Sequence, residues 1–125
     1  MKAILSIKPE YVSQILEGRK TYEFRRKIFK RTDVDAIAIY CTSPQSAVVA
    51  EVKIGNIISA PPELLWQQTG EHGGISHDNF IAYFRGSDTA YAISLQSVKA
   101  FKRPKRLSEY APNVKAAPQS FVYVE

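Results

Sequence analysis

Ten residues in the first quarter of the sequence concentrate groups that could bind or transform a polar ligand. Residues 18–27 (GRKTYEFRRK) hold five lysine or arginine side chains, one carboxylate, one hydroxyl and two aromatic rings. An ordinary surface strand mixes charges of both signs, whereas this run has a single acid among its cations. Such an excess of positive charge favours an anionic ligand or partner.

Side-chain alternation divides this run into two faces. We expect a strand over residues 20–27, with the aromatic pair Tyr22 and Phe24 against the core. The opposite surface then carries Thr21, Glu23 and Arg25. There a carboxylate can accept hydrogen bonds from a ligand, and a guanidinium can fork onto a phosphate or carboxylate. The same row would also fit a salt-bridge ladder between strands, and spacing alone does not separate these two interpretations.

Lys20 stands at the entrance of this strand, where alternation constrains its direction least. Arg19, Arg25 and Arg26 crowd it in the sequence. Neighbouring positive charges lower the pKa of an amine, and a lowered pKa suits a base or a nucleophile. Lys20 is therefore a candidate catalytic residue.

Charge along the rest of the chain points to phosphate-bearing partners. The net charge is +5, and the seventeen Lys and Arg residues cluster, with seven in residues 19–31 and five in residues 99–106. If the fold brings these segments together, their field favours RNA or a nucleotide. The alternative is two solvated basic edges that keep strands from aggregating.

Composition predicts one ordinary globular domain, residues 1–125. The chain is 45% hydrophobic and 23% charged, and a chain of this size can build a core without disulfides or metals. Its only cysteine, Cys41, lies in an apolar run and is expected to be buried.

No segment has the apolar length of a signal peptide or a membrane span, so we expect a cytoplasmic protein that does not bind membranes. No phosphate-loop or dinucleotide motif is present. His72 and His77 have Glu71 and Asp78 beside them, but histidines in a polar loop between helices are usually solvated, so we expect no cofactor or metal.

Periodicity predicts a β-α-β-β-β-α-α-β-β order. The expected strands cover residues 2–8, 20–27, 35–41, 46–59, 90–101 and 121–124. Pro9 begins a helix that Gly18 ends, a second helix follows Pro62, and Ser76 caps a third. The third helix has an apolar face made of Phe80, Ile81, Tyr83 and Phe84. Because the helices are grouped, the order excludes a doubly wound sheet and predicts an α+β fold, a small, mostly antiparallel β-barrel flanked by short helices.

Several blocks of the sequence resemble the ASCH domain family of the PUA-like superfamily. They are residues 6–11 (SIKPEY), 15–26 (ILEGRKTYEFRR), 40–44 (YCTSP), 74–86 and 117–121 (APQSF). The likeness covers nearly the whole chain and is that of a small, stand-alone member of prokaryotic type. It implies a PUA-like barrel whose cleft is floored by the Gly-x-Lys-Thr strand. It also implies RNA-related work: RNA binding, coactivator-like roles, ribonuclease activity, or amidohydrolysis of 4-acetylcytidine.

The resemblance also assigns residues to the site. Lys20 matches the motif lysine, which in the amidohydrolase branch assists a threonine nucleophile three positions on, where this chain has Glu23. Glu23 could instead act as a general base on water, with Lys20 stabilising negative charge. These two residues are the candidate catalytic pair. With loop residues that the ASCH pattern adds, the predicted ligand- or RNA-binding set is Arg19, Lys20, Thr21, Glu23, Arg25, Arg26, Ser43, Lys102, Arg103, Gln119 and Ser120.

Three functions follow as hypotheses. The first is an RNA- or nucleotide-binding protein whose basic cleft takes RNA or a modified nucleoside. The second is a hydrolase on the same cleft, either a ribonuclease or an amidohydrolase of 4-acetylcytidine-like nucleosides. The third is a protein-interaction or transcription-coregulator module whose basic face docks an acidic partner. The sequence specifies no oligomeric state.

Overall fold

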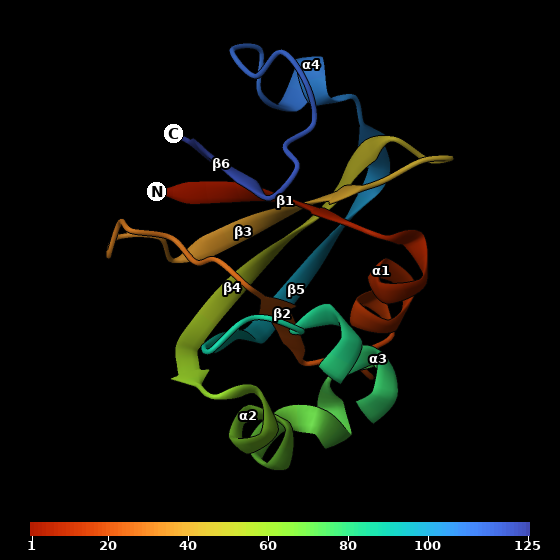
Figure 1. Cartoon of the computed structure of the whole chain (residues 1–125). Helices are drawn as coiled ribbons and strands as arrows, with labels where there is room; N and C mark the ends of the chain where they lie inside the picture. Colours follow the sequence, from red (N-terminus) through yellow and green to blue (C-terminus); the bar gives the residue numbers. More distant parts are fainter.

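Six strands and five short helices make up the chain in a computed structural model, which describes residues 1–125 (Figure 1). The strands are β1 (Lys2–Ile7), β2 (Tyr22–Arg25), β3 (Ala36–Cys41), β4 (Ala47–Ala60), β5 (Ala90–Lys105) and β6 (Phe121–Val124). The helices are α1 (Pro9–Leu16), α2 (Pro62–Thr69), the 3-10 helix η1 (Gly70–His72), α3 (His77–Tyr83) and α4 (Leu107–Tyr110). The predicted order is confirmed, and η1 and α4 are additions. None of the five helices could span a lipid bilayer.

All six strands form one curled sheet, in the order β2-β5-β4-β3-β1-β6. Only β1 and β3 pair in parallel, and every other neighbouring pair is antiparallel. The long strands β4 and β5 shift register at several points, and such bulges bend a sheet. The predicted mostly antiparallel α+β fold is therefore confirmed. The barrel is a half-barrel, because the edge strands β2 and β6 do not pair with each other.

Two apolar clusters fill the two sides of the sheet near β2. The larger joins α1 to residues of β1, β3, β4 and β5, including Leu5 and Ile93, which are at most 1% exposed. The smaller packs Phe24 against α2 and α3, where the rings of Phe24 and Phe80 meet edge to face at 4.9 Å. Figure 1 shows α2 and α3 together at one end of the sheet and α4 at the other.

β2 is buried on both faces, so the open polar face expected from alternation is absent. Glu23 lies opposite Ile93, and Phe24 lies opposite Ala92. Directly opposed residues of an antiparallel pair share a face. Glu23 therefore points with Ile93 toward the larger cluster, while Phe24 points toward the helices. The physical reason is the curl of the sheet, which covers the face that a flat strand would leave open.

Backbone contacts fix the segment that leads into β2. Gly18 adopts a φ of +80°, which ends α1, and the Thr21 N–H donates to the His72 carbonyl at 2.9 Å. The loop that contains His72 approaches so closely that a Cβ on Gly73 would lie 2.6 Å from Cζ of Phe24. A side chain at that position would push this loop away from β2.

Candidate functional site

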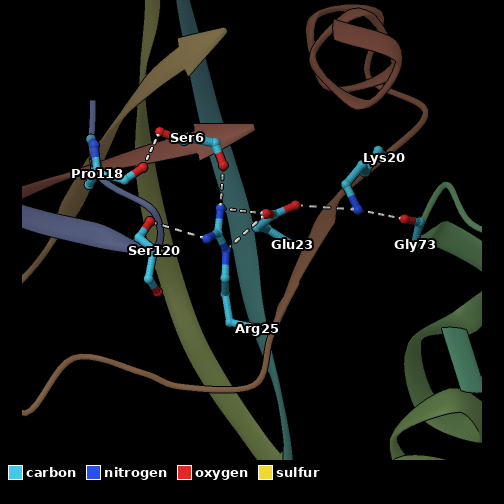
Figure 2. Close-up of polar contacts among 7 residues, drawn as sticks. All are labelled: Ser6, Lys20, Glu23, Arg25, Gly73, Pro118 and Ser120. Atoms are coloured by element: carbon cyan, nitrogen blue, oxygen red, sulfur yellow. Dashed lines mark hydrogen bonds and ion pairs between the residues drawn. The ribbon is translucent and has the colours of Figure 1, made fainter. Parts of the chain in front are cut away.

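Three charged side chains form a buried cluster at β2. Lys20, Glu23 and Arg25 are only 4%, 7% and 9% exposed. One carboxylate oxygen of Glu23 is 3.5 Å from Lys20 Nζ. The other accepts a hydrogen bond from Arg25 Nε at 3.1 Å and lies 3.0 Å from Nη2 (Figure 2). Two cations share one carboxylate, so the fully ionised cluster carries one excess positive charge.

Arg25 also joins the two open edges of the sheet. Its Nη2 donates to the carbonyl of Ser6 in β1 at 2.9 Å, and its Nη1 donates to the carbonyl of Ser120 at 3.2 Å. Figure 2 shows the guanidinium between these carbonyls and Glu23, with the Ser6 hydroxyl donating to Pro118 beside it. A guanidinium has five N–H donors, two of them on Nη1. Because Nη1 makes one hydrogen bond, one of its N–H groups remains for a ligand.

Lys20 is enclosed by a carbonyl, a carboxylate and two aromatic rings. Its Nζ donates to the Gly73 carbonyl at 2.6 Å and lies 5.3 Å from the ring centre of Tyr11 and 5.1 Å from that of Phe24. Burial lowers the Lys20 pKa below its ordinary value of 10.5, Glu23 opposes this shift, and Arg25 adds to it. The lowered pKa agrees with the sequence prediction, although burial rather than crowding by cations is the main cause.

A hollow of about 570 Å³, the basic hollow, opens next to this cluster. Three cations, three neutral polar residues and one aromatic ring line it: Arg25, Arg26, Lys27, Ser87, Gln119, Ser120 and Tyr83. No carboxylate is among them, so the lining favours an anionic ligand. The guanidinium carbon of Arg26 lies 5.1 Å from the ring centre of Tyr83, which places a cation over an aromatic face.

The structure brings only some of the predicted site residues together. Four of them line the hollow: Arg25, Arg26, Gln119 and Ser120. Lys20 and Glu23 are buried and are not part of this lining. The Thr21 carbonyl accepts a hydrogen bond from the Leu95 N–H at 2.9 Å. The backbone of Thr21 therefore joins the segment that leads into β2 to strand β5.

The other predicted residues are exposed and lie apart from the hollow. Arg19 donates twice to the carboxylate of Glu17, at 3.1 and 3.2 Å. Ser43 lies in the turn between β3 and β4. Lys102 and Arg103 lie on the half of β5 that leads to α4, whereas β2 pairs with the half near α2 (Figure 1). The two basic segments of the sequence therefore do not merge at this hollow.

Sequence reasoning missed three residues of the lining: Lys27, Tyr83 and Ser87. Lys27 belonged to the basic run and could have been included on charge alone. Helical spacing predicts Tyr83 on the apolar face of α3, yet this side chain is 38% exposed. Ser87 follows the turn at Gly86, and nothing in the sequence sets it apart.

A larger hollow, about 770 Å³, lies under the segment between α4 and β6. It contains none of the predicted site residues. Two charged residues in its lining, Lys2 and Glu51, pair with each other at 2.8 Å, and the Tyr110 hydroxyl donates to the same carboxylate. The smaller hollow is the better candidate site, because its charged side chains lack an acid partner on the lining.

The lowered Lys20 pKa makes stability depend on pH in a predictable direction. In the unfolded chain Lys20 keeps its ordinary pKa of 10.5, so between the two pKa values the unfolded state binds more protons. This difference makes the free energy of unfolding rise with pH in that window. Lys20→Met removes the contribution while roughly keeping the side-chain volume.

Urea unfolding of the wild type and Lys20→Met at about pH 7 and about pH 10 measures this effect. We expect the wild type to gain stability relative to the variant as the pH rises. A difference that is independent of pH, or that moves toward the variant, would contradict a lowered pKa.

Comparison with known proteins places this geometry in a family. The family model of the ASCH domain matches residues 5–121. An ASCH domain-containing ribonuclease of Zymomonas mobilis is 32% identical over 95 residues, which are 76% of this chain and 64% of that protein. Large ribosomal subunit protein uL22 of Ureaplasma parvum is 28% identical over 100 residues, covering 78% of this chain but only 32% of its own length. The chain thus spans less than two thirds of either relative.

The fold agrees with the sequence match. The crystal structure of the ASCH protein from Zymomonas mobilis superposes with a TM-score of 0.89 at 30% identity, covering 99% of this chain and 87% of that one. The two proteins therefore share the overall arrangement of strands and helices. Together with the family model over most of its length, this shows that the chain belongs to the ASCH domain family.

Proposed function

We propose that this ASCH domain binds RNA through the basic hollow, with Arg25, Arg26 and Lys27 contacting phosphate. The observation that carries the proposal is the lining itself, which holds three cations and no carboxylate. Phosphate contacts supply most of the affinity of sequence-independent RNA binding, and arginine can fork onto phosphate oxygens. The partner is an RNA or nucleotide, and we place the protein in the cytoplasm.

Arg25 is the best prepared of the three cations. Glu23, Ser6 and Ser120 hold its guanidinium from three sides, so little conformational entropy is lost when an anion binds. One N–H of Nη1 remains for a phosphate oxygen. The excess positive charge of the buried cluster adds to the attraction, because the surrounding protein screens it less than water would.

The RNA assignment also has support from the relatives. One is named a ribonuclease and another a protein of the large ribosomal subunit. Both names concern RNA, although each protein is longer than the matched region. These two names support an RNA-related function, and we propose the hollow as its site on the present chain.

Salt dependence tests the proposal. Arg26→Gln/Lys27→Gln removes two charges from the hollow, and each lost phosphate contact lowers the slope of log affinity against log salt by about 0.7 for a single strand. We expect weaker binding to a short single-stranded RNA and a slope smaller by about 1.4. Fluorescence anisotropy at several salt concentrations provides the measurement.

A matched control separates the hollow from net charge. Lys8→Gln/Lys53→Gln removes the same charge from exposed positions outside both hollows. If both double variants lost the same affinity for RNA, binding would depend on the net charge of the protein and not on the hollow. Absence of RNA binding by the wild type even at low salt would refute the function. The variant Lys102→Gln/Arg103→Gln then shows whether the half of β5 that leads to α4 adds contacts to the RNA.

Ribonuclease activity is the second candidate. It is favoured by the name of the Zymomonas relative and by a buried lysine with a lowered pKa beside a carboxylate. In RNA cleavage a base takes the proton of the attacking hydroxyl, whose oxygen bonds to phosphorus while the bond from phosphorus to the leaving oxygen breaks. The protonated base or water returns a proton to the leaving oxygen, and a cation stabilises the charge that develops on phosphate.

Lys20 or Glu23 would be the proton acceptor and Arg25 the stabilising cation. Because Lys20 and Glu23 are buried and outside the lining, this candidate requires the substrate to enter deeper than the hollow, past Arg25. In amidohydrolysis of 4-acetylcytidine the same base would take a proton from water as the water attacks the acetyl carbonyl. The C–N bond would then break, the proton would pass to the nitrogen, and acetate and cytidine would be released.

Incubation of a labelled RNA, and separately of 4-acetylcytidine, with wild type and Lys20→Met tests this candidate. Loss of a general base lowers the rate by about 10² to 10⁴-fold, so turnover by the wild type should nearly vanish in the variant. Lys53→Met, prepared in the same way, controls for contaminating nucleases, and thermal melting confirms that each variant is folded. No turnover by the wild type would exclude the hydrolase, whereas equal turnover in Lys20→Met would exclude a catalytic Lys20.

A further inference from the structure

The lining of the basic hollow includes a cation–π pair that phosphate binding alone does not require. Tyr83 is the only aromatic residue among the large exposed hydrophobics, and it is 38% exposed. The Arg26 guanidinium lies over its ring at 5.1 Å. Both residues line the hollow. A planar cation next to an aromatic ring therefore borders the space in which the proposed phosphate would sit.

The pair rests on a rigid support. Tyr83 is the last residue of α3, and its ring meets that of Phe84 at 4.8 Å and 71°. Phe84 is 2% exposed and contacts the ring of Phe80 at 4.7 Å in the cluster under the helices. Because this chain of rings ends in the core, Tyr83 is held in place before any ligand arrives. A preorganised surface loses little conformational entropy on binding.

We propose that the Arg26–Tyr83 pair binds an unpaired nucleobase, so that the hollow takes one nucleotide of a single-stranded RNA. The proposal rests on the function proposed above and specifies its substrate class. The base stacks on the outer face of the Arg26 guanidinium, and Tyr83 supports that guanidinium from behind. Proteins bind unpaired RNA bases by stacking them on aromatic rings and on guanidinium planes.

The dimensions and the remaining side chains of the hollow fit one nucleotide. Its volume of about 570 Å³ lies within the usual range of small-ligand pockets, roughly 300–1,000 Å³. Arg25 and Lys27 supply positive charge for the phosphate. Gln119 offers both a donor and an acceptor to the edge of a base, and Ser87 offers a hydroxyl. Bases inside a duplex are covered on both faces by their neighbours, so a helix cannot use the stacking surface.

A charge-conserving substitution separates base stacking from phosphate binding. Arg26→Lys keeps the positive charge but removes the plane, and Tyr83→Leu removes the supporting ring, whereas Tyr83→Phe keeps it. The probes are a five-nucleotide oligouridylate and an abasic ribose-phosphate chain of equal length. We expect wild type and Tyr83→Phe to bind the oligouridylate at least about fivefold more tightly than the abasic chain. Arg26→Lys and Tyr83→Leu should bind both probes with similar affinity.

An oligonucleotide that carries 2-aminopurine gives a second readout, since stacking quenches its fluorescence. Quenching by the wild type that is lost in Arg26→Lys would support the proposal. Equal binding of both probes by the wild type, with no quenching, would overturn base recognition while leaving phosphate binding intact. Failure to bind either probe at low salt would overturn the RNA function and the base site together. Tyr83 and Arg26 are exposed side chains, and thermal melting checks that their variants fold.

Discussion

The carboxylate of Glu23, held between Lys20 and Arg25 inside a curled sheet, is the interaction on which this structure depends. Without it two buried cations would face each other, and removing one partner from a buried ion pair commonly costs about 3–5 kcal/mol. With it, Arg25 keeps an orientation in which it reaches the carbonyls of Ser6 and Ser120. One side chain thus links edges of the half-barrel that no backbone pairing joins.

The same guanidinium connects the fold to the proposed function. Arg25 faces the buried carboxylate on one side and lines the basic hollow on the other. An anion in the hollow would offset the excess positive charge of the cluster, and it would contact the residue that holds the sheet edges together. Ligand binding and the stability of the half-barrel are therefore expected to be coupled, because anything that binds the folded state preferentially stabilises it.

Strand alternation and helix signals predicted the order of the main elements, and the basic run correctly marked β2. They did not predict that β2 is buried on both faces, because the contacts that bury Arg25 come from residues 19 and 95 positions away in the chain. The cluster of cations around Lys102 predicted that this segment lies at the same site as Arg25. Residues that are close in the sequence to other cations need not be close to the site in space, and this segment lies apart from the hollow. Tyr83 has the spacing of a core residue, and only the packing of α3 shows that its ring reaches the hollow.

A crystal structure of the protein soaked with uridine monophosphate tests the central claim most directly. The account predicts a phosphate oxygen within about 3.2 Å of Arg25 Nη1, with the Lys20–Glu23–Arg25 contacts unchanged behind it. A phosphate bound instead in the larger hollow beside Lys2 and Glu51, with the basic hollow free of nucleotide, would contradict it.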